Sequence, residues 1–243
     1  MRRICLLGAS GSIGSQTLDV MRKNSTDFTL VAFSVGSKTR KIAHIINMYP
    51  DVKAICIKDK NKVNYYQSKY PNISFYSGDD GLLKLIDNDC DMVVNALVGF
   101  VGLKPTLYAL EQNKIVCLAN KEALVVGGEL VNELLNKGYG KLYPIDSEHS
   151  AIKKCLMVDS QNVSKVMLTA SGGAFRKLNR DEDGGTLLPV NINRTDSRGV
   201  RTWTKKSFSI PVGESSGRSA KGASAAYMRW KRKAHSARSH TPR

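Results

Sequence analysis

The chain has 243 residues, of which 37 are Lys or Arg and 21 are Asp or Glu, so its formal net charge is +16. Hydrophobic residues make up 42% and charged residues 24%, which is typical of a globular protein and excludes collagen-like, coiled-coil and disulfide-scaffold classes. No run approaches the roughly 18 apolar residues of a membrane-spanning helix. The apolar run after Arg2 and Arg3 is too short for a signal peptide. We therefore expect a cytoplasmic protein that does not bind membranes.

The cysteines are scattered and form no Cys-x-x-Cys pair, so the sequence signals neither a zinc site nor a redox dithiol. We expect them to be reduced and mostly buried. They are Cys5, Cys56, Cys90, Cys117 and Cys155.

Short apolar runs typical of buried strands alternate with helix-compatible stretches along the first 182 residues. The predicted strands are 4–7, 30–35, 54–57, 92–97, 115–119 and 166–169, and the predicted helices include 13–21, 41–48, 82–87 and 104–112. This alternation is typical of βαβ units. The fold class is therefore α/β, with a Rossmann-like doubly wound parallel sheet.

A glycine-rich turn, Gly8-Ala9-Ser10-Gly11-Ser12-Ile13-Gly14, separates the first predicted strand from the first predicted helix. Glycines at such a turn let the backbone approach a pyrophosphate, which the helix N-terminus then faces. The position predicts a dinucleotide site, and the alternative is a purely structural turn.

The segment after the second predicted strand, Ser34-Val35-Gly36-Ser37-Lys38-Thr39-Arg40, contains no acidic residue. An Asp or Glu here would select NAD by binding the ribose 2′-hydroxyl. The two cations, Lys38 and Arg40, instead favour a 2′-phosphate, so we predict NADPH over NADH. Alternatively, they are solvated cations at the start of the next helix.

Polar residues follow the strand predicted at 115–119, in the motif Asn120-Lys121-Glu122. Ligands in open α/β sheets bind outside the carboxyl ends of the strands, so Lys121 could supply a cation and Glu122 could carry a proton. The alternative is an ordinary helix start, with Asn120 as the N-cap.

Two carboxylates occur in Pro144-Ile145-Asp146-Ser147-Glu148-His149-Ser150. In an extended segment Asp146 and Glu148 would point to the same side and could share a Mg²⁺ or Mn²⁺ ion. His149 is then a ligand, an acid or base, or a residue that caps the next helix. Farther along, the segment from Leu168 to Arg176 combines Ser171 with two glycines and an Arg, which suits a phosphate.

Together, these motifs resemble the 1-deoxy-D-xylulose 5-phosphate reductoisomerase family over residues 1 to about 182. The resemblance implies NADPH-dependent rearrangement and reduction of that sugar phosphate to 2-C-methyl-D-erythritol 4-phosphate in the non-mevalonate pathway of isoprenoid biosynthesis. It also implies a Mg²⁺ or Mn²⁺ cofactor that acts as a Lewis acid, and a homodimer when the protein is full length.

The resemblance assigns roles to individual residues. Asp146 and Glu148 would bind the metal, Lys121 and Glu148 would be catalytic, and the substrate would contact Lys121, Ser147, Glu148 and Ser171. The expected cofactor-binding residues are Gly8, Ser10, Gly11, Ser12, Ile13, Gly36, Lys38, Asn120 and Glu122.

The resemblance stops after residue 182. Residues 183–243 hold 13 basic and 3 acidic residues but only eight Leu, Ile, Val or Phe, a composition typical of a segment without a core. They lack the family's His-Pro-x-Trp flap and its Asn-Lys-x-x-Glu metal motif. We therefore expect an NADPH-binding domain at 1–143, an incomplete catalytic and metal-binding domain at 144–182, and a disordered basic tail at 183–243 that arises from a shifted reading frame or a gene-model error. Such a chain would bind NADPH without appreciable turnover.

Two other classes of protein remain as alternatives. A semialdehyde dehydrogenase has similar glycine spacing but needs an activated cysteine, and none of the cysteines here has such a setting. A non-enzymatic binding protein would use the α/β part as a scaffold and the basic tail, with Trp230 among cations, as its contact surface. Steep salt dependence of binding to unrelated DNA duplexes would support the second alternative, but we expect no specific nucleic-acid partner.

Overall fold

The computed structural model describes residues 1–158, 165–169, 193–195 and 200–204. The chain divides into two compact units, and the described part of the first unit is Met1–Ile145. The second unit begins at Asp146. The boundary predicted between residues 143 and 144 thus lies two residues before the one in the structure.

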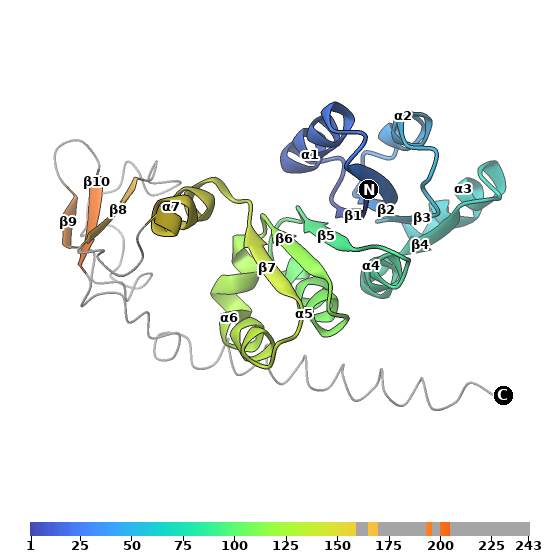
Figure 1. Cartoon of the computed structure of the whole chain (residues 1–243). Coiled ribbons are helices and arrows are strands. Elements are labelled where there is room, and N and C mark those ends of the chain that lie inside the picture. The colour runs from blue at the N-terminus through green and yellow to red at the C-terminus, as the bar shows by residue number, and fades with distance from the viewer. Residues whose placement is uncertain (159–164, 170–192, 196–199, 205–243) are drawn as a thin grey trace, which may run out of the picture. The chain divides into compact units, whose positions relative to one another are not determined.

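A seven-stranded parallel sheet forms the centre of the first unit (Figure 1). The order across the sheet is β4-β3-β2-β1-β5-β6-β7. The chain therefore builds outward from β1 in one direction and from β5 in the other, and the reversal between these strands is where ligands of such sheets bind. The strands are β1 (Arg2–Leu7), β2 (Phe28–Val35), β3 (Ala54–Ile57), β4 (Ser74–Ser77), β5 (Met92–Asn95), β6 (Ile115–Leu118) and β7 (Lys141–Pro144).

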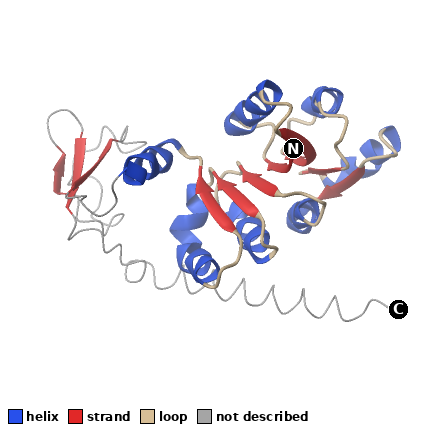
Figure 2. Cartoon of the chain, in the orientation of Figure 1, coloured by secondary structure: helices blue, strands red, loops and turns tan. Residues whose placement is uncertain are grey.

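Helices cover both faces of this sheet and enclose two apolar cores (Figures 1 and 2). Helices α1 (Ser12–Lys23), α2 (Lys41–Met48) and α3 (Val63–Lys69) pack on one face. Helices α4 (Gly78–Ile86), α5 (Leu103–Glu111) and α6 (Lys121–Asn136) pack on the other. Short 3₁₀ turns, η1 (Lys60–Lys62) and η2 (Phe100–Gly102), precede α3 and α5.

The doubly wound α/β class is confirmed. The predicted strands correspond to β1, β2, β3, β5, β6 and β8 (Lys165–Thr169), while β4 and β7 were not predicted. These two strands lie at the edges of the sheet, where half of the backbone has no neighbouring strand, so they lack the continuous apolar runs of the central strands. Strand β7 also ends in Pro144, which an edge position tolerates.

The described part of the second unit consists of helix α7 (Ser147–Val158) and a three-stranded antiparallel sheet, ordered β8-β10-β9. Strands β9 (Asn193–Thr195) and β10 (Val200–Thr204) fall within the tail that we expected to be disordered. The expectation did not include these strands, and the β-branched and aromatic residues of β10 suit a strand. Disorder of the tail as a whole stays a prediction. The other residues of 183–243 lie outside the described residues.

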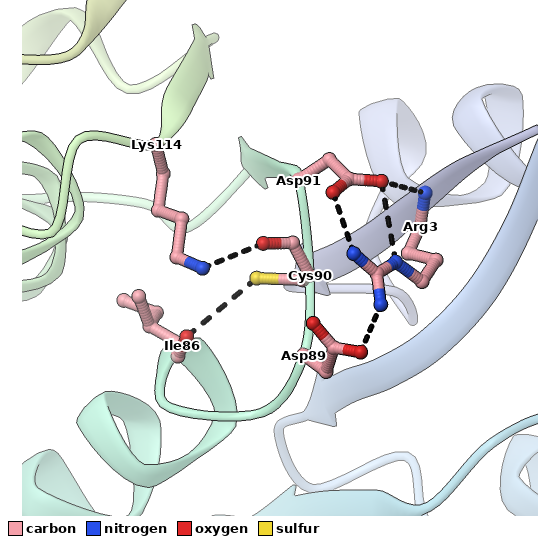
Figure 3. Close-up of polar contacts among 6 residues, drawn as sticks. All are labelled: Arg3, Ile86, Asp89, Cys90, Asp91 and Lys114. Carbon is pink, nitrogen blue, oxygen red and sulfur yellow. Dashed lines mark hydrogen bonds and ion pairs between the residues drawn. The ribbon is translucent and has the colours of Figure 1, made fainter.

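Polar contacts tie together the amino-terminal ends of β1 and β5 (Figure 3). The Arg3 guanidinium forms an ion pair with Asp91 at 2.9 Å and also contacts Asp89. The Arg3 backbone N–H donates to the Asp91 carboxylate at 2.9 Å. These hydrogen bonds from Arg3 hold the pKa of Asp91 below its ordinary value. At the adjacent start of β6, the Lys114 ammonium donates to the Cys90 carbonyl at 2.7 Å.

Among the described helices, none combines the length and the apolar character needed to cross a membrane.

Candidate functional site

The predicted cofactor residues of the first unit lie at the carboxyl ends of adjacent strands. Gly8 follows β1, Gly36 follows β2 and Asn120 lies two residues after β6. Because β2, β1, β5 and β6 are neighbours in a parallel sheet, these loops share one edge, on either side of the reversal in strand order.

Two glycines of the first loop are required by packing. Gly8 has a φ of +90°, and a Cβ there would lie 2.6 Å from the Ala96 carbonyl oxygen. A Cβ at Gly14 would lie 2.2 Å from the Gly8 carbonyl oxygen. The Ser34 hydroxyl of β2 accepts a hydrogen bond from the Gly8 N–H at 2.9 Å, which fixes the loop against the neighbouring strand. The structural-turn alternative therefore accounts for Gly8 and Gly14.

Two other glycines at this edge are not explained by packing. A Cβ at Gly11 would meet only the Gly8 carbonyl oxygen, at an ordinary 3.4 Å, and a Cβ at Gly36 would meet nothing within 4 Å. Neither glycine has a positive φ. The absence of a side chain thus leaves accessible backbone beside both loops, which is the property that a closely approaching ligand uses.

The N-terminus of α1 offers hydrogen-bond donors at the same place. Its N-cap is Gly11, which has no side chain to accept from the first turn, and that turn contains no acidic residue. The first N–H groups of a helix have no partner within the helix and carry a partial positive charge. Ser10, Ser12 and Ile13 line this end of the helix, so the segment suits an anionic group such as a pyrophosphate.

Cations approach this edge from the loop between β2 and α2. Lys38 and Arg40 are exposed and precede α2, which begins at Lys41. The Lys41 ammonium donates to the Ser10 carbonyl at 3.3 Å and to the Ser15 hydroxyl at 3.0 Å. We did not predict a role for Lys41. In the sequence, the only indication that Lys41 could have a role was its position at the end of a run of cations.

The Asn120 side chain is buried and bonded to protein groups. Its oxygen accepts from the Ala123 N–H at 3.0 Å, which confirms the helix-cap alternative for the start of α6. Its nitrogen donates to the carbonyls of Leu97 and Gly99 at 2.9 and 2.8 Å. A Cβ at Gly102 would lie 2.5 Å from this amide, so the turn needs a glycine there. A contact between Asn120 and the cofactor stays a prediction. Because the side chain is already bonded to protein groups, the backbone of Asn120 is the part more available for such a contact.

A second buried amide, Asn95 at the end of β5, holds the same segment and was not predicted as a site residue. It donates to the Gly102 carbonyl at 2.9 Å and to the Thr106 hydroxyl at 2.8 Å, and it accepts from the Leu97 N–H at 3.2 Å. The two asparagines therefore determine the path of residues 97–102 at the carboxyl edge. The sequence did contain a signal for this role, because Asn95 is a polar residue at the end of an apolar run that predicts a buried strand.

Lys121 and Glu122 form the first turn of α6, next to this amide network. A Glu122 carboxylate oxygen accepts from the Asn120 amide at 3.3 Å. Lys121 is exposed. Both side chains begin at the carboxyl edge of the sheet, as predicted, and their roles toward a ligand stay predictions.

In the second unit, the extended conformation expected for residues 146–148 is wrong, because helix α7 begins at Ser147. Asp is favoured immediately before a helix, and the Asp146 carbonyl accepts from the Ser150 N–H at 2.9 Å. The Asp146 carboxylate contacts a His149 ring nitrogen at 3.0 Å, and the Ser147 hydroxyl donates to Glu148 at 2.7 Å. Each carboxylate is thus bonded to a neighbouring side chain at the start of the helix, Asp146 to His149 and Glu148 to Ser147.

These two carboxylates do not form a metal site by themselves. Within the described ranges, no group of three or more His, Cys, Asp or Glu residues could hold a metal ion. Oxygen donors of this kind suit Mg²⁺ or Mn²⁺, but such an ion would need ligands beyond Asp146 and Glu148. Ser171, the remaining predicted substrate contact, lies outside the described residues.

Two family models match the chain. The model of 1-deoxy-D-xylulose 5-phosphate reductoisomerase matches residues 4–128, and the model of the C-terminal domain of that enzyme matches residues 142–186. The second match ends four residues after the predicted limit of the resemblance at 182.

Relatives of known name support the same family. The chain is 45% identical over 184 residues to 1-deoxy-D-xylulose 5-phosphate reductoisomerase 2 of Bacillus thuringiensis subsp. konkukian, covering 75% of this chain and 48% of the relative. It is 42% identical over 204 residues to the Clostridium kluyveri reductoisomerase, covering 82% of this chain and 53% of that protein. The chain thus spans about half the length of these relatives.

Solved structures of reductoisomerases are also similar to this chain. The reductoisomerase from Zymomonas mobilis in complex with NADPH superposes with a TM-score of 0.65 at 31% identity, over 73% of this chain and 48% of that chain. A DOX-P reductoisomerase in complex with NADPH, fosmidomycin and magnesium has a TM-score of 0.65 at 32% identity, over 74% of this chain and 47% of that chain.

Proposed function

Because the chain belongs to the 1-deoxy-D-xylulose 5-phosphate reductoisomerase family, we propose that its first unit binds NADPH and that it carries the beginning of that family's active site. The observation that carries the proposal is the pair of glycines, Gly11 and Gly36, whose missing side chains are not required by the fold and leave two loops open at the carboxyl edge. Gly11 is also the N-cap of α1, whose N-terminus has no side-chain cap. Such an edge accepts a pyrophosphate at the helix and a ribose at the end of β2.

The residues of the first unit fit NADPH. Gly8, Ser10, Gly11, Ser12 and Ile13 would line the pyrophosphate, and Gly36 would lie under the adenosine ribose, with Lys38 as a cation for its 2′-phosphate. Asn120 and Glu122 would lie toward the nicotinamide. When bound, NADPH supplies a hydride. The chain's own residues would hold the cofactor and orient it at the reversal in strand order.

The proposed reaction of the complete protein is the NADPH-dependent rearrangement and reduction of 1-deoxy-D-xylulose 5-phosphate to 2-C-methyl-D-erythritol 4-phosphate in isoprenoid biosynthesis. Lys121, Ser147, Glu148 and Ser171 would contact the sugar phosphate, and Lys121 and Glu148 would act in catalysis. Asp146 and Glu148 would bind Mg²⁺ or Mn²⁺. Because two carboxylates do not complete a site for either ion, we derive no step through the metal for this chain.

We propose that this 243-residue chain binds NADPH without appreciable turnover. It spans about half of its relatives, and residues 183–243 contain neither the flap motif nor the further metal motif that the resemblance leads one to expect. A shifted reading frame or gene-model error would explain this. Resequencing the coding DNA across codon 182 tests that explanation, because another frame should then encode His-Pro-x-Trp and Asn-Lys-x-x-Glu.

The cofactor proposal is tested by calorimetric titration of the purified chain with NADPH and NADH. We expect NADPH to bind at least about 10-fold more tightly, since a charge-assisted contact to the 2′-phosphate contributes about 1.5–3 kcal/mol. Absence of binding by either nucleotide would refute the cofactor site, and equal affinities would refute the preference. Substrate-dependent NADPH oxidation by this polypeptide with Mg²⁺ would refute the lack of turnover.

We also propose a cytoplasmic location, which the free cysteines support because an exposed thiol such as Cys155 suits a reducing compartment. A homodimer is proposed for the full-length protein, without a specific nucleic-acid or membrane partner. Light scattering of a chain restored to full length measures the oligomeric state, and a monomer there would refute the dimer.

A further inference from the structure

Lys41 connects the two loops that border the open edge of the sheet. It is the first residue of α2, whereas its contacts, the Ser10 carbonyl at 3.3 Å and the Ser15 hydroxyl at 3.0 Å, belong to the glycine loop and the first turn of α1. The Ser15 hydroxyl itself donates to the Gly11 carbonyl at 2.8 Å. The ammonium thus lies beside the backbone of the loop that the fold leaves open.

The surroundings of Lys41 suit a second anion in addition to a pyrophosphate. The carbonyl and hydroxyl that it contacts are neutral, so the positive charge of Lys41 is not neutralised by these contacts. Lys41 is exposed, and an ammonium has three N–H donors. In contrast, the cations of α1, Arg22 and Lys23, form ion pairs with Asp19.

The position along the fold identifies which anion this would be. In dinucleotide-binding sheets the pyrophosphate lies at the N-terminus of the first helix, and the adenosine ribose lies at the end of the second strand. Lys41 originates on the side of β2 and reaches the loop before α1, so its ammonium lies between those two positions. A phosphate on the ribose 2′-oxygen would then lie in the space between the end of β2 and the loop before α1. Gly36, where a Cβ would meet nothing within 4 Å, borders that space at the end of β2.

We infer that Lys41 is a specificity-determining residue for NADPH, whose ammonium, held over the glycine loop by Ser10 and Ser15, receives the ribose 2′-phosphate. The inference rests on the proposed NADPH site and extends it. Lys38 and Arg40 contribute positive charge to the mouth of the site, but Lys41 is the cation of this run for which the structure gives hydrogen bonds to the glycine loop.

The test uses the full 243-residue chain and two nucleotides, NADPH and NADH, which differ only by the 2′-phosphate. Lys41→Met removes the charge and keeps most of the aliphatic chain, Lys41→Arg keeps the charge, and Lys53→Met is the matched control at the amino-terminal side of β3. Titration calorimetry gives the Kd of each pair, and circular dichroism checks that each variant keeps the fold of the wild type.

We expect Lys41→Met to weaken NADPH binding about 10- to 100-fold and to change NADH binding less than about 2-fold, as the loss of one charge-assisted contact predicts. Lys41→Arg should recover most of the NADPH affinity, and Lys53→Met should match the wild type. An equal loss for both nucleotides would overturn the inference, since Lys41 would then act only on the loop or the pyrophosphate. No loss for either would also overturn it.

Failure of the cofactor proposal looks different. A wild-type chain that binds neither nucleotide refutes the NADPH site itself. A wild-type chain that prefers NADPH, together with a Lys41→Met variant that keeps the same preference, refutes only the role of Lys41.

Discussion

The two ends of the central sheet differ in how their polar groups are used. At the amino-terminal end, Arg3 pairs with Asp91, and the Lys114 ammonium is bonded to the Cys90 carbonyl (Figure 3). At the carboxyl end, Gly11 and Gly36 expose backbone without a packing reason, and the N-terminus of α1 has no side-chain cap. Polar groups that are satisfied within the protein stabilise the fold, whereas open backbone at the carboxyl edge of such a sheet is available to a ligand. Variants of Arg3 and of Gly36 should therefore affect different measurements, whereas variants of carboxyl-end residues that packing requires should affect stability.

The largest effect is expected within the carboxyl end, where packing does require a glycine. Gly14→Ala places a Cβ 2.2 Å from the Gly8 carbonyl oxygen, so the loop must move. We expect the free energy of unfolding to fall by about 2–4 kcal/mol, measured by urea denaturation. The matched control is Gly128→Ala in α6, where a Cβ meets nothing within 4 Å and alanine should stabilise the helix by up to about 1 kcal/mol. Equal stability of the two variants would contradict this.

Asn120→Asp tests the buried amide that holds residues 97–102. The new carboxylate would face the Leu97 and Gly99 carbonyls, to which the amide donates. We expect a loss of about 2–3 kcal/mol at pH 7. Burial beside two carbonyl oxygens raises the pKa of the new carboxyl, so the loss should shrink as the pH falls and the group is protonated. Urea denaturation at several pH values measures this, and a loss that is independent of pH would argue against the proposed contacts.

Gly36→Ala separates binding from stability. A Cβ there meets no protein atom within 4 Å, so the free energy of unfolding should change by less than about 0.5 kcal/mol. If NADPH lies against this backbone, the added methyl group should weaken its binding about 10-fold, which is about 1.4 kcal/mol. Calorimetry and urea denaturation of the same preparation give both values. Unchanged affinity would mean that the ligand does not approach Gly36.

Arg3→Met should give the smallest effect, confined to the amino-terminal end. Both side chains of the ion pair are more than one-third exposed, at 39% and 36%. Solvent therefore screens their attraction, and its loss should lower the free energy of unfolding only slightly at pH 7. NADPH affinity should be unchanged. A variant that lost NADPH affinity with its fold intact would contradict the division between the two ends.

The same variant has an expected pH dependence. The pKa of Asp91 is lower in the folded chain than in the unfolded chain because of its hydrogen bonds from Arg3. The stabilisation is therefore complete above the unfolded pKa of about 3.9 and is lost as the pH falls through the folded pKa. The difference in stability between the wild type and Arg3→Met should vanish in that acidic range, as acid titration of both proteins would show.

Sequence patterns were sufficient where the physical cause is local. Apolar runs of the central strands and the periodicity of the helices predicted the parallel sheet, and the glycine spacing after β1 placed the candidate cofactor site at the carboxyl edge of that sheet. The absence of an acidic residue after β2 indicated NADPH. The edge strands β4 and β7 were missed because their burial depends on which strands neighbour them.

By itself, the sequence determined the fold class, the family resemblance and most candidate residues, because each depends on residues that are close together in the chain. Only the tertiary structure decided which glycines serve packing and which leave the edge open, since that depends on how the loop folds onto its own backbone and against Ala96. It also placed Lys41 on Ser10, which is 31 residues away. Contacts between residues far apart in the chain form only after the strands pair, so no local pattern records them.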